Sequence, residues 1–340
     1  MTPLFSDKSD IFTDALLQIS ERYNLIDIVT LRLTKEHIPF GLVAVESLSR
    51  ERKILPFFGN KVIAEISGTP LHQVEQICIT AEGRLCGYQK EHHLEKFVFI
   101  GDKLIKFIGK DKVSRVDSFT LASNGDLLFA LTIWHNGSFL FRGEERIELS
   151  ESIKNNHVTD FNIDKNNELI GRVLVTDTGE RKRWVLLKGN RACVSIGGYL
   201  IFECESLIHS SQKDYAGVVQ LKDSGAIVPF LGDKIITRIG RQSILNTSHL
   251  QFGANGELIG VATLSNQSKV IFSGESVIEK IGGKYFRAVK QLRVTAKGGI
   301  AGVASLFNGY DVPFIGDRLF EVMPRKAPNT TTAPVATRTC

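Results

Sequence analysis

Short apolar runs that end in glycine recur along the chain at intervals of 42 to 46 residues. Examples are Phe57-Phe58-Gly59 and Phe230-Leu231-Gly232, and a polar pair such as Asp233-Lys234 follows most of them. Glycine readily adopts the positive φ that a tight hairpin needs, and Asp or Asn tolerates the next position. The pattern predicts seven copies of strand, tight turn, strand, with the turns at Gly59, Gly101, Gly143, Gly189, Gly232, Gly274 and Gly316.

A segment in which apolar positions alternate with polar ones precedes a second turn in each repeat. In the sixth repeat, Leu250 and Phe252 lie six and four residues before Gly256. Alternation with a period of two is typical of a strand. Four residues after this turn another glycine follows in six repeats, and Phe129 takes its place in the third. Because glycine weakens a strand, its recurrence predicts close backbone approach or a bend there; the six are Gly41, Gly87, Gly171, Gly217, Gly260 and Gly302.

Each repeat therefore contains four short strands, here named a, b, c and d in chain order. Four strands at this period match one blade of a β-propeller, and the chain resembles the β-propeller superfamily over about residues 24–323. The pattern of Asn124-Gly125-Asp126-Leu127 and Asn255-Gly256-Glu257-Leu258 is loosely similar to NHL-type repeats. The resemblance implies an all-β, seven-bladed β-propeller of four-stranded antiparallel blades. An open β-solenoid is the alternative, but its usual repeats are shorter.

Two segments flank these repeats. Residues 1–23 form an N-terminal extension, in which positions 10–23 place Phe12, Leu16, Ile19 and Tyr23 on one face of a helix. This predicts a short amphipathic helix that covers the propeller edge or channel mouth, or alternatively binds a partner. Residues 324–340 are polar and lack periodicity, so we expect a disordered tail.

Composition places the chain among globular proteins, with 43% hydrophobic and 23% charged residues. It has no apolar run of membrane-spanning length and no export signal at its start. The five cysteines form no CxxC motif, which favours structural thiols in a reducing compartment over disulfides or metal ligands. We therefore expect a cytoplasmic protein; delivery into a host cell is a variant that the sequence does not test. A net charge of +5 over 340 residues does not favour nucleic-acid binding.

A polar column lies seven residues before the a–b turn in all seven repeats. By analogy with propellers, strand a lines the central channel, and a water-filled channel needs such a lining. The functional alternative is a ligand or catalytic site at the channel. Its candidate residues are Asp160, His249, Arg32 and Arg293; the column itself comprises Thr30, Gln76, Ser118, Asp160, Ser206, His249 and Gln291.

Charge runs in the b–c hairpins give a second candidate site. A basic rim of this kind would bind phosphate or an acidic partner, whereas acids such as Glu51 favour the alternative of a solvated hairpin. No phosphate-binding glycine loop, HExxH or GxSxG motif is present, so we predict no metal or cofactor. The candidate partner-binding residues are Arg50, Arg52, Lys53, Arg181, Lys182, Arg183 and Trp184.

These observations favour a non-enzymatic, monomeric scaffold that binds a protein partner, acidic or phosphorylated, through its loop face. The alternative is a propeller enzyme with a polar site at the central channel, resembling lactonases of similar length. The sequence favours the scaffold and leaves the enzymatic reading open.

The tail gives a first prediction. Cutting the chain after Met323 should leave the melting temperature unchanged, because a polar aperiodic segment has little apolar area to bury. Thermal unfolding of the two chains tests this, and a clear drop in the truncated chain would show that the tail is docked.

Overall fold

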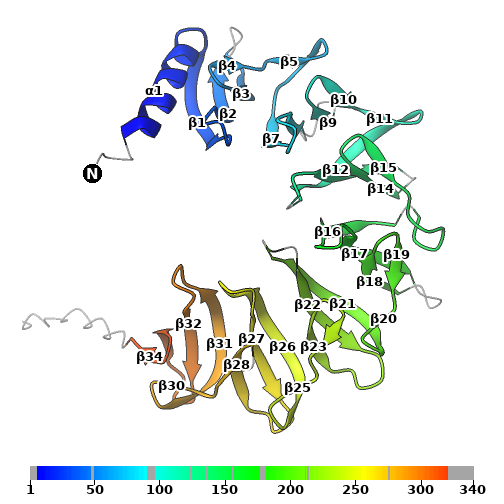
Figure 1. Cartoon of the computed structure of the whole chain (residues 1–340), viewed down its shortest axis with the longest axis vertical. Coiled ribbons are helices and arrows are strands. Elements are labelled where there is room, and N and C mark those ends of the chain that lie inside the picture. The colour runs from blue at the N-terminus through cyan, green and yellow to red at the C-terminus, as the bar shows by residue number, and fades with distance from the viewer. Residues whose placement is uncertain are drawn as a thin grey trace, which may run out of the picture. The chain divides into compact units, whose positions relative to one another are not determined.

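The computed structural model describes residues 6–46, 50–89, 96–122, 124–134, 137–154, 156–176, 181–210, 212, 214–274 and 276–320. This part of the chain contains one helix, α1 (Ser6–Ser20), and 34 strands (Figure 1). The all-β class predicted from the sequence is thus confirmed. The tail, residues 324–340, lies outside the described residues.

The chain folds as two compact units, Met1–Ile236 and Thr237–Cys340, and the first unit contains five antiparallel sheets and a small hairpin. The first sheet holds β1 (Asn24–Leu33), β2 (Pro39–Glu46), β3 (Arg52–Phe58) and β4 (Lys61–Val62). The hairpin β5 (Glu65–Ile66) and β6 (Thr69–Pro70) precedes the second sheet, which holds β7 (Val74–Ile79), β8 (Leu85–Gln89), β9 (Phe97–Ile100) and β10 (Lys103–Ile105).

The remaining sheets of the first unit follow in chain order. The third sheet holds β11 (Phe107–Ile108), β12 (Asp111–Leu121), β13 (Leu127–Ile133), β14 (Gly137–Arg142) and β15 (Glu145–Ile147). The fourth holds β16 (Val158–Ile163), β17 (Leu169–Thr176), β18 (Lys182–Lys188) and β19 (Arg191–Cys193). The fifth holds β20 (Ser195–Ile196), β21 (Tyr199–His209), β22 (Tyr215–Leu221), β23 (Ile227–Leu231) and β24 (Lys234–Ile235).

The second unit contains two further sheets of the same kind. The sixth sheet holds β25 (Arg238–Ile239), β26 (Gln242–Phe252), β27 (Leu258–Leu264), β28 (Lys269–Ser273) and β29 (Ser276–Ile278). The seventh holds β30 (Lys280–Ile281), β31 (Lys284–Val294), β32 (Ile300–Leu306), β33 (Asp311–Ile315) and β34 (Arg318–Leu319).

Within each sheet the strands a to d pair in chain order, as the repeat predicts. Consequently the b–c turns lie at one end of every sheet, here called the loop end. The a–b and c–d turns lie at the other end, here called the turn end. All seven c–d glycines have a φ between +55° and +60°, which confirms the predicted tight turn.

The prediction of four strands needs correction in four sheets. A two-residue strand (β11, β20, β25 or β30) pairs with the start of strand a and makes the third, fifth, sixth and seventh sheets five-stranded. The cause is a second glycine hairpin, seen in Ile196-Gly197-Gly198 and Ile281-Gly282-Gly283, whose glycines have positive φ. The sequence pattern does not predict this hairpin, because its strands are only two residues long.

Each of these hairpins contacts the c–d turn of the sheet that begins with it. Gly282 donates its main-chain N–H to the carbonyl oxygen of Asp317 at 2.8 Å. A β-carbon built at Gly197 would lie 2.9 Å from the carbonyl oxygen of Asp233, so only glycine fits there without a shift. In the fourth sheet, Ser150 donates its N–H to the turn carbonyl of Asn190 at 2.8 Å. At these three turns, the residue after the c–d glycine therefore fixes the segment by which the chain enters the same sheet.

The strand-b glycines make the predicted close approach. A β-carbon at Gly41 would lie 2.0 Å from the carbonyl oxygen of Thr30, and one at Gly217 would lie 2.2 Å from that of Ser206. Both oxygens belong to the polar column of strand a, where β1 and β21 are bulged. On the other side, Gly217 pairs with Phe230, whose ring would lie 2.6 Å from the same β-carbon. Close packing against a backbone and a ring thus requires glycine.

Helix α1 covers the first sheet. It runs over Ser6–Ser20 rather than the predicted 10–23, and Ile19 is fully buried against the first sheet's core. Leu16 and Tyr23 pack against the same cluster, as the predicted helical face requires. Figure 1 shows α1 on the side of β1 away from β7. The helix therefore packs on the first sheet through the predicted apolar face.

The c–d turn can be tested at Gly232, where φ is +55° and nothing lies within 4 Å of a built β-carbon. Space is not limiting, so Gly232→Val should lose about 1–3 kcal/mol of stability from backbone strain alone. Gly232→Asn should lose less, since Asn tolerates the left-handed region better. Urea unfolding measures both, and equal stability of the Val variant and the parent chain would contradict the turn assignment.

Candidate functional site

Asp160 and His249, the two titratable residues of the polar column, share a left-handed backbone conformation. The pairing of β16 with β17 is interrupted at Asp160, and that of β26 with β27 at His249. Their φ angles are +51° and +54°, in the left-handed region that costs a residue with a side chain about 1–3 kcal/mol. Strain of this kind gathers at functional sites, so both positions remain candidates.

The four candidate channel residues are divided between the units. Arg32 on β1 and Asp160 on β16 belong to the first unit, while His249 on β26 and Arg293 on β31 belong to the second. All four are exposed. Among the described residues, Asp160 is the only one of the four whose side chain has a hydrogen-bond or ion-pair partner.

Asp160 joins the fourth sheet to the fifth. Arg172 donates from Nε to the Asp160 carboxylate at 2.7 Å and from Nη1 to the carbonyl oxygen of Glu205 at 2.7 Å. His209 hydrogen-bonds through Nε2 to the carbonyl oxygen of Asp160 at 2.9 Å. Because a carbonyl only accepts, Nε2 carries the proton, and burial lowers the pKa of His209 and favours the neutral ring. The contacts explain how the strained Asp160 backbone is held.

A cluster of Ser138, His157 and Asp117 lies near the contacts of Asp160 and Arg172. The sequence pattern did not predict this cluster. His157 Nδ1 lies 3.1 Å from Ser138 Oγ and 3.8 Å from Asp117 Oδ2. A catalytic triad needs the serine and the carboxylate on different ring nitrogens, whereas here both face Nδ1. Ser138 is also only 4% exposed. The cluster therefore links the third and fourth sheets and lacks the geometry of a nucleophilic site. Its three residues do not recur at equivalent positions of the other repeats, so the sequence pattern gives no sign of the cluster.

Some rim residues are exposed and others are half-buried. Arg50, Arg52, Arg181 and Lys182 are exposed and Lys53 is half-buried, all of them at the loop ends of the first and fourth sheets.

Arg183 and Trp184 are half-buried and contact other parts of the protein. Arg183 donates from Nη1 to the carbonyl oxygen of Phe202 and lies over that ring, at 5.3 Å from its centroid. Trp184 lies beneath the Arg172 guanidinium at 5.2 Å and beside the His157 ring at 5.7 Å. These two side chains therefore support the joint between sheets as well as bordering the rim.

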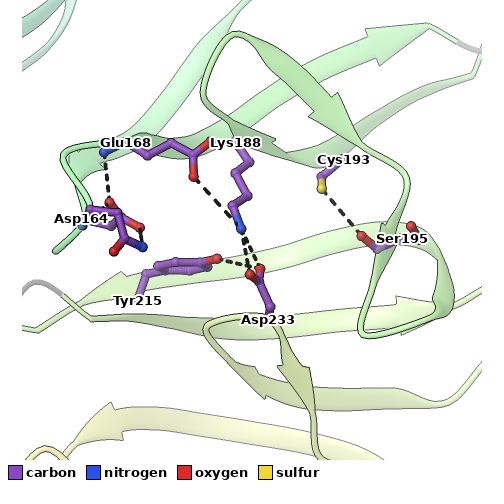
Figure 2. A network of polar contacts seen from close by, with 8 residues as sticks. Asp164, Glu168, Lys188, Cys193, Ser195, Tyr215 and Asp233 are labelled. Atoms are coloured by element: carbon purple, nitrogen blue, oxygen red, sulfur yellow. Dashed lines mark hydrogen bonds and ion pairs between the residues drawn. The ribbon is translucent and has the colours of Figure 1, made fainter.

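Two cavities occupy equivalent places at the turn end. One of about 400 Å³ lies between the second and third sheets and one of about 360 Å³ between the fourth and fifth. Asp233 borders the second cavity and accepts hydrogen bonds from Lys188 Nζ at 2.7 and 2.8 Å and from the Tyr215 hydroxyl at 2.9 Å (Figure 2). In the first cavity, Glu144 accepts in the same way from Arg84 and Lys103.

The charges in these cavities neutralise one another. Lys188 lowers the pKa of Asp233, and Asp233 raises that of Lys188. Burial, and then the nearby carboxylate, raises the pKa of Tyr215 and keeps its hydroxyl protonated. The paired groups Lys188, Tyr215 and Asp233 thus hold the fourth sheet against the fifth.

The described residues hold no group of three His, Cys, Asp or Glu side chains placed to bind a metal ion. Within the same ranges, no helix is long and apolar enough to cross a membrane. Cys78, Cys86 and Cys204 are buried and Cys193 is half-buried, all as free thiols. Cys340 lies outside the described ranges.

No protein-family model and no curated protein matches the chain. The chain resembles solved β-propellers. The β-propeller domain of the Trilobed protease from Pyrococcus furiosus has 11% identity and a TM-score of 0.38, over 89% of this chain and 100% of that one. The Dos1 propeller has 8% identity and a TM-score of 0.39, over 86% and 79%. Virginiamycin B lyase from Staphylococcus aureus has 11% identity and a TM-score of 0.33, over 74% and 88%. These values carry no argument about function.

The Lys188–Asp233 pair predicts a pH dependence. Because the folded state lowers the pKa of Asp233 below its ordinary 3.8, the pair stabilises the protein fully above that value and less as pH falls through the lowered pKa. Asp233→Asn should cost about 0.2–1 kcal/mol at pH 7, a small effect because Asp233 is largely exposed, and should flatten the loss of stability below pH 4.

Urea unfolding from pH 3 to 7 measures this effect. Asp223→Asn is the control, since Asp223 is an exposed acid at the loop end of the same sheet. Equal acid slopes for Asp233→Asn and the parent chain would contradict the role of the pair.

Proposed function

We propose that this chain is a seven-bladed β-propeller, with its seven sheets as the blades, that binds a protein partner through its loop face without catalysing a reaction. One observation carries the proposal. Asp160 and the cluster of Ser138, His157 and Asp117 are bound to other parts of the protein, whereas several rim cations are exposed. Asp160 is held by Arg172 and His209, and Ser138 is buried.

The rim chemistry suits an anionic partner surface. Arg50 and Arg52 carry guanidinium groups, which bind carboxylates and phosphates through paired hydrogen bonds. Lys182, in the fourth sheet, is a further exposed cation. The proposed partner is therefore an acidic or phosphorylated protein, bound by a monomer of this chain. The free thiols fit a reducing, cytoplasmic compartment.

One observation favours an enzymatic role as the second candidate. Asp160 and His249 occupy the same column of the repeat and share a strained backbone, and strain is common at active sites. The candidate activity is hydrolysis of a lactone at the channel.

Charge reversal separates the two functions. The partner is first captured with the tagged full-length chain, identified and purified for titration. Changing Arg50, Arg52 and Lys53 together to Glu should then weaken its binding at least about tenfold, with a strong dependence on salt, since surface charges are screened over about 8 Å. Asp160→Asn and His249→Gln should leave binding unchanged.

The chain offers a matched control at the opposite end of its sheets. Lys61, Arg191 and Lys234 are exposed cations of the c–d turns, and their reversal changes the net charge by the same amount. Binding lost equally in both triple variants would contradict a specific loop-face site. Turnover of a lactone or sugar acid that disappears with Asp160→Asn or His249→Gln would establish the enzyme instead.

A further inference from the structure

Two cysteines face each other at the base of the a–b turn of the second sheet. Cys78 on β7 pairs directly with Cys86 on β8. Both belong to a core cluster whose other members come from the second and third sheets, and there Cys78 is 8% exposed and Cys86 is fully buried. The two cysteines meet through strand pairing and not through a CxxC sequence, so their spacing in the chain gives no sign of the pair.

The two thiols influence each other's ionisation. Opposed residues of an antiparallel pair point to the same face of the sheet. Contact with Cys86, and then burial, raises the pKa of Cys78, whereas contact with Cys78 lowers the pKa of Cys86. Arg84, whose carbonyl oxygen lies 3.5 Å from the Cys86 sulfur, lowers the pKa of Cys86 further. Cys86 is therefore the member of the pair that more readily becomes a thiolate.

The fold does not require cysteine at these two positions. Among the described cysteines, Cys193 has Leu186 opposite and Cys204 has Val219, so only Cys78 and Cys86 oppose each other. The other six sheets form the same a–b turn with opposed pairs that contain no cysteine, namely Arg32–Phe40, Thr120–Leu128, Asn162–Ile170, Ile208–Ala216, Gln251–Ile259 and Arg293–Ala301.

We propose that Cys78 and Cys86 form a reversible disulfide when the protein meets an oxidant, and that this bond locks the a–b turn of the second sheet. Directly opposed residues have α-carbons about 4.5–5.5 Å apart, within the range of about 4.4–6.8 Å that a disulfide spans. Their β-carbons lie about 4.5–5.5 Å apart, whereas a disulfide prefers about 3.5–4.5 Å. The bond therefore forms with strain and is easily reduced again, which suits a switch in a reducing compartment.

A cavity brings a small oxidant close to the pair. The cavity of about 400 Å³ between the second and third sheets is lined by Arg84 and by Ile100, which pairs with Cys86 from β9. The oxidant proposed is hydrogen peroxide, which is small and uncharged. The Cys86 thiolate attacks one peroxide oxygen and releases hydroxide, which takes up the proton that Cys86 had lost. The sulfur of Cys78 then attacks the resulting sulfenic acid, and the hydroxyl group leaves with the Cys78 proton as water.

The locked turn is also a contact between sheets. Ala81 donates its N–H to the carbonyl oxygen of Gly125 in the third sheet at 3.1 Å, and Arg84 pairs with Glu144 at 2.7 Å. Both Ala81 and Arg84 lie inside the ring that a bond between positions 78 and 86 would close. A covalent link at the base of the turn keeps the two strands from separating there. Oxidation should therefore protect this contact between the second and third sheets against local opening.

Peptide mapping tests the bond. The folded full-length chain is treated with hydrogen peroxide, alkylated and digested. The expected product is a disulfide-linked peptide of Cys78 and Cys86, which reduced glutathione converts back to two free thiols. Cys193→Ala should give the same product, whereas Cys86→Ala should give none. Alanine stands at the place of Cys86 in the fifth and seventh sheets, as Ala216 and Ala301, so the Cys86→Ala variant should fold.

Amide hydrogen exchange tests the lock. Oxidation of the parent chain should slow exchange at residues 80–84 by about tenfold, because the turn then opens less often. Reduced glutathione should restore the faster exchange. The same peroxide treatment of Cys86→Ala should leave exchange at these residues unchanged.

Three results would overturn the proposal. The first is that Cys78 and Cys86 stay free, or oxidise separately to sulfinic acids, while Cys193 is oxidised in the same sample. The second is a disulfide that appears only after the chain is unfolded in urea, since the native strands then do not allow it. The third is a disulfide in the folded chain that leaves exchange at residues 80–84 as fast as before. None of these results bears on partner binding, because the proposal does not rest on the loop face.

Discussion

The close approach of strand a to strand b is the constraint on which much of this fold depends. At the bulge in strand a, the carbonyl of a polar-column residue points at the α-carbon of a strand-b glycine. Thr30 and Gly41 show this, and so do Gln291 and Gly302, where a β-carbon would lie 2.1 Å from the oxygen. An aromatic ring of strand c often covers the same glycine. The polar column and the glycine column are therefore two sides of one local structure.

Exceptions to this arrangement have physical causes. In the third sheet Phe129 replaces the glycine, and its ring stacks on Phe141 at 4.9 Å between centroids. In the fourth and sixth sheets, Asp160 and His249 adopt positive φ at the bulge. There the strand-b glycine meets a side chain of strand a, such as the Phe161 β-carbon, which would lie 2.8 Å from a β-carbon at Gly171. Positive φ at the two candidate residues thus accompanies a different contact of the strand-b glycine.

The sequence predicted the long strands and the glycines of the repeat, and it missed the shortest hairpins and the contacts between sheets. The seven c–d turns and the strand-b glycines were evident because a fixed backbone geometry selects glycine at a fixed interval. The helical face of α1 was evident from its periodicity, although its boundaries moved by several residues. The Ile-Gly hairpins escaped because two-residue strands give no alternation, and His157 escaped because its partners come from distant positions. No periodic pattern encodes contacts between side chains of different sheets.

The candidate site, too, could be predicted only in part from the sequence. Charge runs in the b–c hairpins were visible in the sequence, but the engagement of Arg183 with Phe202 depends on the neighbouring sheet. The turn ends are closed by ion pairs such as Lys188–Asp233, which join adjacent sheets. The loop ends carry exposed cations.

Amide hydrogen exchange of the full-length chain, alone and with its purified partner, tests the central claim most directly. The account predicts that the partner slows exchange at the loop ends, in residues 50–53 and 181–184, and leaves the c–d turns at 59–61 and 232–234 unchanged. Protection confined to the c–d turns, or to the channel-candidate strand at 158–163, would contradict it.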